Sequence, residues 1–123
     1  MFNVEGYVIT LSRGDTGGMR VVAEATLNGE PFTFGPDDRA LFSIKNAQGE
    51  VVKEKVAELD NNTFMVYFMN QDTDTLAPGQ FSWDVRYIIH PYYDASGRIV
   101  NGDQVLTPKE PQSMNLLTVV GDV

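Results

Sequence analysis

The chain has 123 residues and no cysteine, and its 17 acidic side chains outnumber 9 basic ones, which gives a net charge of -8 at pH 7. This length predicts a single domain, residues 1–123, with a core large enough to be stable without covalent cross-links. The lack of cysteine excludes disulfides, thiolate zinc sites and cysteine nucleophiles. The negative charge excludes nucleic acid as an expected partner, because it would repel a phosphate backbone.

The sequence contains neither a secretory leader nor a long apolar stretch. The segment Met1–Gly6 lacks a basic region followed by an apolar run, and no run of about 18 apolar residues occurs anywhere. We therefore expect a protein that stays in solution and has no membrane partner.

Turn-forming residues recur along the chain at intervals of about 10 to 15 residues, and the segments between them alternate apolar with polar side chains. This pattern predicts an all-β fold, an antiparallel sandwich of about seven to nine strands. In chain order the expected strands are residues 7–12, 20–27, 40–45, 50–59, 64–69, 80–90, 98–100, 104–107 and 114–120.

Two of these assignments involve a choice. In residues 50–59, the spacing of Val52, Val56 and Leu59 also fits a helix, but the valines and the flanking turns favour a strand. We interpret it as an outer strand with four solvated charges, Lys53, Glu54, Lys55 and Glu58. Near the C-terminus, Asn101-Gly102 predicts a hairpin turn between strands 98–100 and 104–107.

The clearest strand follows the turn at Pro78-Gly79. One face of it is apolar and carries Phe81, Trp83, Val85, Tyr87 and Ile89, whereas the other face carries Ser82, Asp84, Arg86 and His90. Because all neighbours of Trp83 on its face are apolar, we expect this only tryptophan to lie in the core.

No set of residues indicates catalysis. His90 shares a predicted face with Ser82 and Asp84, but residues two apart on a strand lie about 6.5 to 7 Å apart, and no G-x-S-x-G motif is present. The acidic clusters around Asp38 and Asp72 lack the EF-hand spacing, so we expect solvated turn residues there. We predict that the protein is not an enzyme and needs neither a cofactor nor a metal.

Two segments are candidates for binding a partner. Strand 64–69 is apolar on both faces, so that one face can pack in the core while the other lies under an outer strand or docks on a neighbouring protein. Tyr92-Tyr93, beside Asp94, would make an aromatic platform for a sugar or a peptide. The candidate partner-binding residues are Met65, Tyr67, Met69, Tyr92 and Tyr93.

Two short runs resemble a known family. The first, Arg13-Gly14-Asp15-Thr16, follows the first predicted strand; the second, residues 73–85, carries Thr73, Leu76, Gly79, Phe81, Trp83, Asp84 and Val85. They are similar to a Gly-Asp-Thr loop and a Thr-x-x-Leu-x-x-Gly-x-Tyr-x-Trp/Tyr-Asp-Val/Ile run. Both occur in the immunoglobulin-like domains of tailed-phage and prophage structural proteins, notably the N-terminal domain of baseplate upper proteins. The chain departs from that pattern at Phe81, where the family has tyrosine.

The resemblance implies an immunoglobulin-like sandwich with a non-enzymatic role in protein-protein assembly. Its implied partners are other phage tail or baseplate proteins, or a second copy of the chain in a homo-oligomer. Its implied location is the virion tail, after synthesis in the bacterial host cytoplasm. The alternative is a carbohydrate- or peptide-binding sandwich using Tyr92, Tyr93 and Trp83, and burial of Trp83 would count against it.

Overall fold

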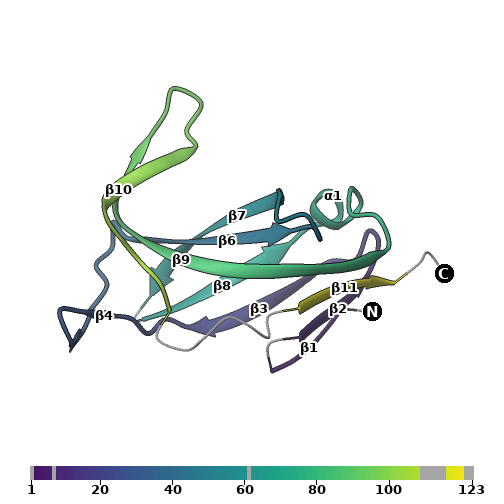
Figure 1. Cartoon of the computed structure of the whole chain (residues 1–123), viewed down its shortest axis with the longest axis horizontal. Helices are drawn as coiled ribbons and strands as arrows, with labels where there is room; N and C mark the ends of the chain where they lie inside the picture. The colour runs from purple at the N-terminus through teal and green to yellow at the C-terminus, as the bar shows by residue number, and fades with distance from the viewer. Residues whose placement is uncertain (1, 7, 61, 109–115, 121–123) are drawn as a thin grey trace.

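The computed structural model describes residues 2–6, 8–60, 62–108 and 116–120. Within them the chain forms 11 strands and one short helix, α1 (Asn70–Thr73), so the predicted all-β fold is confirmed (Figure 1). The strands are β1 (Asn3–Glu5), β2 (Val8–Ser12), β3 (Gly17–Val22), β4 (Thr26–Leu27), β5 (Glu30–Pro31), β6 (Arg39–Lys45), β7 (Val51–Asp60), β8 (Thr63–Phe68), β9 (Gly79–Tyr93), β10 (Ile99–Leu106) and β11 (Leu116–Val120).

Most of the strands belong to one mixed sheet. Its 9 strands follow the order β1-β2-β11-β9-β6-β7-β8-β3, with β10 paired to β9. The described pairs are antiparallel except β2 with β11, which run parallel from Val8↔Leu116 to Ser12↔Val120. The expectation of a purely antiparallel sheet is therefore wrong. Alternating side chains determine which face of a strand is buried, but they do not determine the direction of its neighbour.

The sheet curls at β7, so that β8 and β3 come to lie across the core from β6 and β9. β7 pairs with β6 along Val51–Glu58 and then with β8 at Leu59 and Asp60. Aromatic rings meet across the core: the Phe42 ring on β6 lies 5.6 Å from the Phe68 ring on β8, and the Phe64 and Tyr87 rings lie 6.1 Å apart. The core is the space between β6 and β9 on one side and β8 and β3 on the other.

Strand β9 has the alternation that the sequence predicts. Trp83 is 5% exposed, and its ring stacks on Phe42 with the centroids 5.1 Å apart. Val85, Tyr87 and Ile89 are buried on the same face, and Phe81 is half-buried. The predicted burial of Trp83 is confirmed.

The predicted turn at Asn101-Gly102 is wrong. β10 runs through both residues, and the chain reverses instead at Asp94–Gly97, where the Asp94 carboxylate accepts hydrogen bonds from the backbone of Ser96 and Arg98. Glycine at position 102 lets β10 lie close to β9. A Cβ there would lie 2.6 Å from Ile88 Cγ2 and 2.7 Å from the Ile89 carbonyl oxygen.

One other predicted strand is shorter than expected, and two predicted strand starts are not tested. β3 ends at Val22, where the predicted strand continued to Leu27, and the Ala23 amide donates one further hydrogen bond to the Asn62 carbonyl, just before β8. Leu27 belongs to a separate small hairpin, β4 with β5. The expected strand starts at Tyr7 and Met114 lie outside the described residues.

Candidate functional site

His90, the only histidine, lies at the surface beside Asp103. Within the described ranges, no three His, Asp or Glu side chains gather into a group that could hold a metal ion. His90 lies with Nδ1 3.0 Å from Asp103 Oδ2, and the Tyr92 hydroxyl donates to the other carboxylate oxygen of Asp103. The His90 and Asp103 side chains are 61% and 48% exposed. This cluster faces water, so it lacks the enclosed setting that acid-base catalysis uses.

An apolar surface lies on the outward side of β8, where the sequence predicts it. Phe64, Val66 and Phe68 point into the core, whereas Tyr67 and Met69 are 61% and 54% exposed and Met65 is half-buried. Val56 of β7 is 52% exposed beside them. We call this surface the β8 face and define it by Met65, Tyr67, Met69, Val56 and two flanking charges, Arg20 and Glu58.

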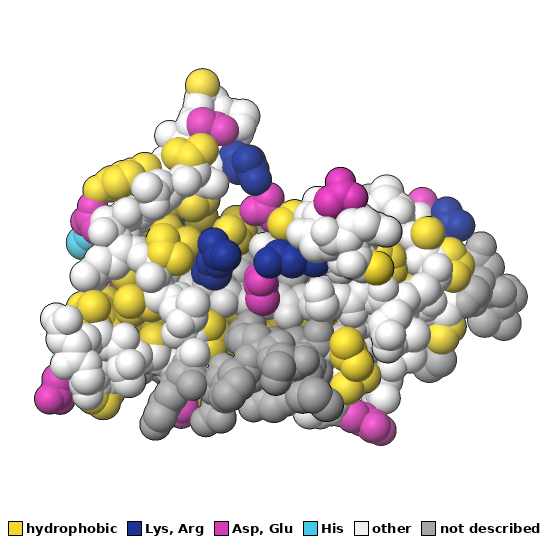
Figure 2. All heavy atoms as spheres, in the orientation of Figure 1, with side chains coloured by type: hydrophobic (Ala, Val, Ile, Leu, Met, Phe, Trp, Pro, Cys, Tyr) yellow, Lys and Arg dark blue, Asp and Glu magenta, His cyan; other side chains and the backbone are white. Residues whose placement is uncertain are grey.

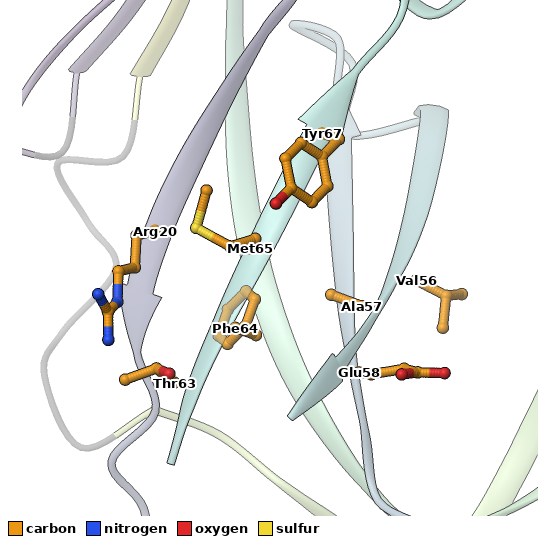
Figure 3. Close-up of a pocket in the computed structure, with 8 residues that line it drawn as sticks. All are labelled: Arg20, Val56, Ala57, Glu58, Thr63, Phe64, Met65 and Tyr67. Atoms are coloured by element: carbon orange, nitrogen blue, oxygen red, sulfur yellow. The ribbon is translucent and has the colours of Figure 1, made fainter. Parts of the chain in front are cut away.

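A groove of about 550 Å³ runs along the β8 face (Figure 3). It forms because the ladder between β7 and β8 covers only Leu59↔Phe64 and Asp60↔Thr63. On the other side of β8, Gly18 of β3 lies opposite Tyr67. A Cβ at Gly18 would come within 3.3 Å of Tyr67 Cδ1, so glycine leaves room for the tyrosine ring. The groove is lined by Arg20, Val56, Ala57, Glu58, Thr63, Phe64, Met65 and Tyr67.

Two charged residues border the apolar part of this groove on opposite sides. Figure 3 shows Arg20 on β3 and Glu58 on β7, with Met65 between them. Glu58 lies 3.8 Å from Arg39 and remains 85% exposed, and Arg20 makes no ion pair with any described residue. Sequence reasoning named neither charge as a site residue, because their place beside Met65 depends on which strands are neighbours.

The structure separates Tyr92 and Tyr93, which are each 51% exposed. Tyr92 contacts Asp103 and lies away from the groove that Tyr93 lines. That groove, of about 360 Å³, lies between the β9–β10 hairpin and the outer side of β6 and β7, with Leu41 and Val56 as its apolar floor. Arg98 closes one side of it by a 2.6 Å contact with Glu54. Figure 2 shows the hairpin projecting from the rest of the molecule, with a hollow beside it.

The two short sequence runs around Gly14 and Thr73 lie together in space. The Thr73 hydroxyl donates to the Asp15 carbonyl at 2.7 Å, and the Asn70 side-chain amide donates to the Gly14 carbonyl at 2.9 Å. Arg13 Nε donates to the Asp74 carbonyl at 3.1 Å. These hydrogen bonds attach the loop between β2 and β3 to α1. The residues that make them stabilise the fold rather than offering side chains to a ligand.

The acidic residues expected to be solvated are buried in two cases. Asp38 is 4% exposed and accepts from the Gly35 and His90 amides at 2.7 and 3.2 Å. Asp72 is 6% exposed and lies 3.2 Å from Lys53 Nζ and 2.7 Å from Lys55 Nζ. The two lysines, also expected to be solvated, thus join β7 to α1.

The environment of Asp72 favours its charged form. Burial by itself would raise the pKa of Asp72, but hydrogen bonds from Lys55, the Met69 amide and Lys53 outweigh it and hold this pKa below its usual value. The spacing of Lys53 and Lys55, which places both on one side of a strand, is the signal available in the sequence.

Comparison with protein-family models, with curated proteins and with solved structures found no match. In the part of the chain that the structure describes, no helix is both long and apolar enough to cross a membrane.

Proposed function

We propose that this protein is a non-enzymatic structural component of a phage or prophage tail or baseplate, in which an immunoglobulin-like domain acts as a protein-protein assembly module. Its place would be the virion tail, after synthesis in the host cytoplasm, and its partners other tail or baseplate proteins. The proposal starts from the two sequence runs quoted above. The hydrogen bond between Thr73 and Asp15 supports the proposal, because it makes the two runs parts of one structural contact.

The strand arrangement supports an immunoglobulin-like form of the sandwich. The antiparallel run β11-β9-β6 packs across the core from the antiparallel pair β3-β8. Such a domain puts three consecutive neighbours in one layer and a second layer opposite, around a buried tryptophan. Here Trp83 occupies the core from β9.

The observation that carries an assembly role is the β8 face. Tyr67 and Met69 expose large apolar side chains next to the half-buried Met65, on a rigid strand that is fixed by its buried neighbours. Contiguous apolar side chains beside a groove are typical of surfaces that bind other proteins.

Isolation of phage particles from a host that carries the gene would test this function. We expect the protein to co-sediment with intact tails, and deletion of its gene to yield particles with defective tails. Normal, infectious particles from the deletion strain, with the protein absent from purified virions, would refute the virion role.

A second function has one specific observation in its favour, the groove beneath Tyr93. An exposed aromatic ring beside a hollow is a common way to bind a sugar or a peptide. The burial of Trp83 removes the larger ring from such a site. Glycan and peptide arrays would test it: binding that is lost in Tyr93→Ala and kept in Tyr92→Ala would favour this function over assembly.

A further inference from the structure

We propose that the β8 face is the interface of a homodimer with a two-fold axis parallel to β8. The inference rests on the proposed function, since it names the first partner of the assembly surface: a second copy of this chain. It is carried by the positions of Arg20, Met65 and Glu58.

These three residues line one groove. Arg20 pairs directly with Met65 across β3 and β8. Leu59 pairs with Phe64 across β7 and β8. Beyond these pairs β7 and β8 are separated by the groove, and Glu58 lies on the β7 side of it. A positive charge on β3 and a negative charge on β7 therefore stand on opposite sides of the apolar Met65 (Figure 3).

Around Tyr67 the described neighbours on both sides carry no charge. Gly18 lies opposite Tyr67 on β3, and Val56 lines the groove on the β7 side. With Met65, this makes an apolar strip along β8, bordered by Arg20 on the β3 side and Glu58 on the β7 side (Figure 3).

Such a surface is complementary to itself. A two-fold axis that lies in the interface along β8 exchanges the two sides of the strip, so Arg20 of each copy faces Glu58 of the other. The strips then pack against each other, Tyr67 on Tyr67 and Met65 on Met65. An axis across the strands at Met65 would instead place Arg20 opposite Arg20, so the charges favour one orientation.

The free edge of β7 is a poorer place for a second copy. Symmetric antiparallel pairing of two β7 strands, centred on Lys53, Glu54 or Lys55, places like charges directly opposite each other. The net charge of -8 on each copy opposes any dimer at long range, but salt screens that repulsion beyond about 8 Å at physiological strength. Salt weakens the short-range attraction between Arg20 and Glu58 less.

Charge exchange between the copies tests this geometry. The molar mass of the full chain is measured by sedimentation across the micromolar range for the wild type, Arg20→Glu, Glu58→Arg and an equimolar mixture of the two variants. We expect a wild-type dimer, a dissociation constant at least about tenfold higher for each variant alone, and recovery in the mixture. Each variant alone places two like charges opposite each other at both contacts. In a mixed dimer, one contact joins the two substituted side chains and the other joins the two native ones, so opposite charges meet at both.

Matched controls carry the same charge changes elsewhere. Arg86→Glu on β9 and Glu30→Arg on β5 alter exposed side chains away from the β8 face and should leave the dimer intact. Far-UV circular dichroism checks that every variant is folded, and recovery in the mixture cannot arise from folding. A wild type that is monomeric throughout this range, or a mixture that stays monomeric, overturns the dimer.

The dimer and the proposed function fail in different ways. If the wild type is monomeric but Tyr67→Asp prevents incorporation into tails, the β8 face binds another tail protein, and only the dimer is refuted. If the wild type dimerises but is absent from particles, the dimer stands and the tail function is refuted.

Discussion

Thr73, which has no exposed surface, donates a hydrogen bond to the carbonyl of Asp15 at 2.7 Å, and so fastens α1 to the loop between β2 and β3. The two residues are 58 positions apart in the sequence. Their contact explains why two short runs that look unrelated in the sequence belong to one structural unit.

Thr73→Val should therefore lower stability without changing the shape of the side chain. The variant removes the hydroxyl donor from a partly buried hydrogen bond to the Asp15 carbonyl, and we expect a loss of about 1 to 3 kcal/mol in the free energy of unfolding. Urea unfolding measures it. Thr75→Val, at an exposed position of the following turn, is the control and should change stability by less than about 0.5 kcal/mol. Equal effects of the two substitutions would contradict the role of Thr73.

Asp72 makes the stability depend on acidity. Because the folded pKa of this carboxyl lies below its ordinary value of 3.8, the stabilisation is complete well above pH 3.8 and is lost as pH falls through the folded pKa. Asp72→Asn should lower stability at pH 7 by about 1 to 3 kcal/mol and weaken the acid dependence. Unfolding curves from pH 7 to pH 3 measure both, with the exposed Asp74→Asn as control. An unchanged acid dependence in Asp72→Asn would mean that other carboxylates are responsible.

Gly102 should tolerate no side chain, although it lies in a strand on a projecting hairpin. The Cβ of Gly102→Ala would meet Ile88 Cγ2 at 2.6 Å and the Ile89 carbonyl oxygen at 2.7 Å, and we expect a loss of about 1 to 3 kcal/mol. The comparison is Gly35→Ala, where the nearest atom is 3.7 Å away. If thermal melting shows both variants to be equally stable, β10 approaches β9 less closely than these distances require.

The sequence predicts the local features of this fold better than its long-range contacts. The alternation in β9 requires Trp83 to be buried whatever strand lies beside it. Asn101-Gly102, by contrast, fits both a turn and a close approach of two strands, and only the position of Ile88 decides between them. The burial of Asp72 in α1 depends on Lys53 and Lys55 of β7, and the residues around Asp72 do not indicate it.

The candidate site divides in the same way. The outward direction of Met65, Tyr67 and Met69 follows from the period of one strand, which the sequence contains. The charges that border them, Arg20 and Glu58, belong to strands β3 and β7. Their place depends on the strand order, which periodicity does not contain.

Trp83 should report the integrity of the core by fluorescence, since it is the only tryptophan. At 5% exposure and stacked on Phe42, it should emit at the short wavelengths of a buried indole and shift to the red on unfolding. Trp83→Ala should cost about 3 to 5 kcal/mol. Native emission typical of an exposed indole, with little loss of stability in the variant, would point instead to a ligand platform.

Tyr67 and its neighbour Val66 should respond in opposite ways to the same substitution. Tyr67 is 61% exposed, so Tyr67→Asp should change the free energy of unfolding by less than about 1 kcal/mol, whereas Val66 is 1% exposed and Val66→Asp should prevent folding. The two residues are adjacent in β8, and only the direction of the side chain differs. Urea unfolding of Tyr67→Asp, beside expression and circular dichroism of both variants, measures the contrast. Because a folded Tyr67→Asp protein keeps the rest of the molecule intact, any loss of association in it can be attributed to the β8 face. If Tyr67→Asp also unfolds the chain, the tyrosine is part of the core and the docking surface must lie on other strands.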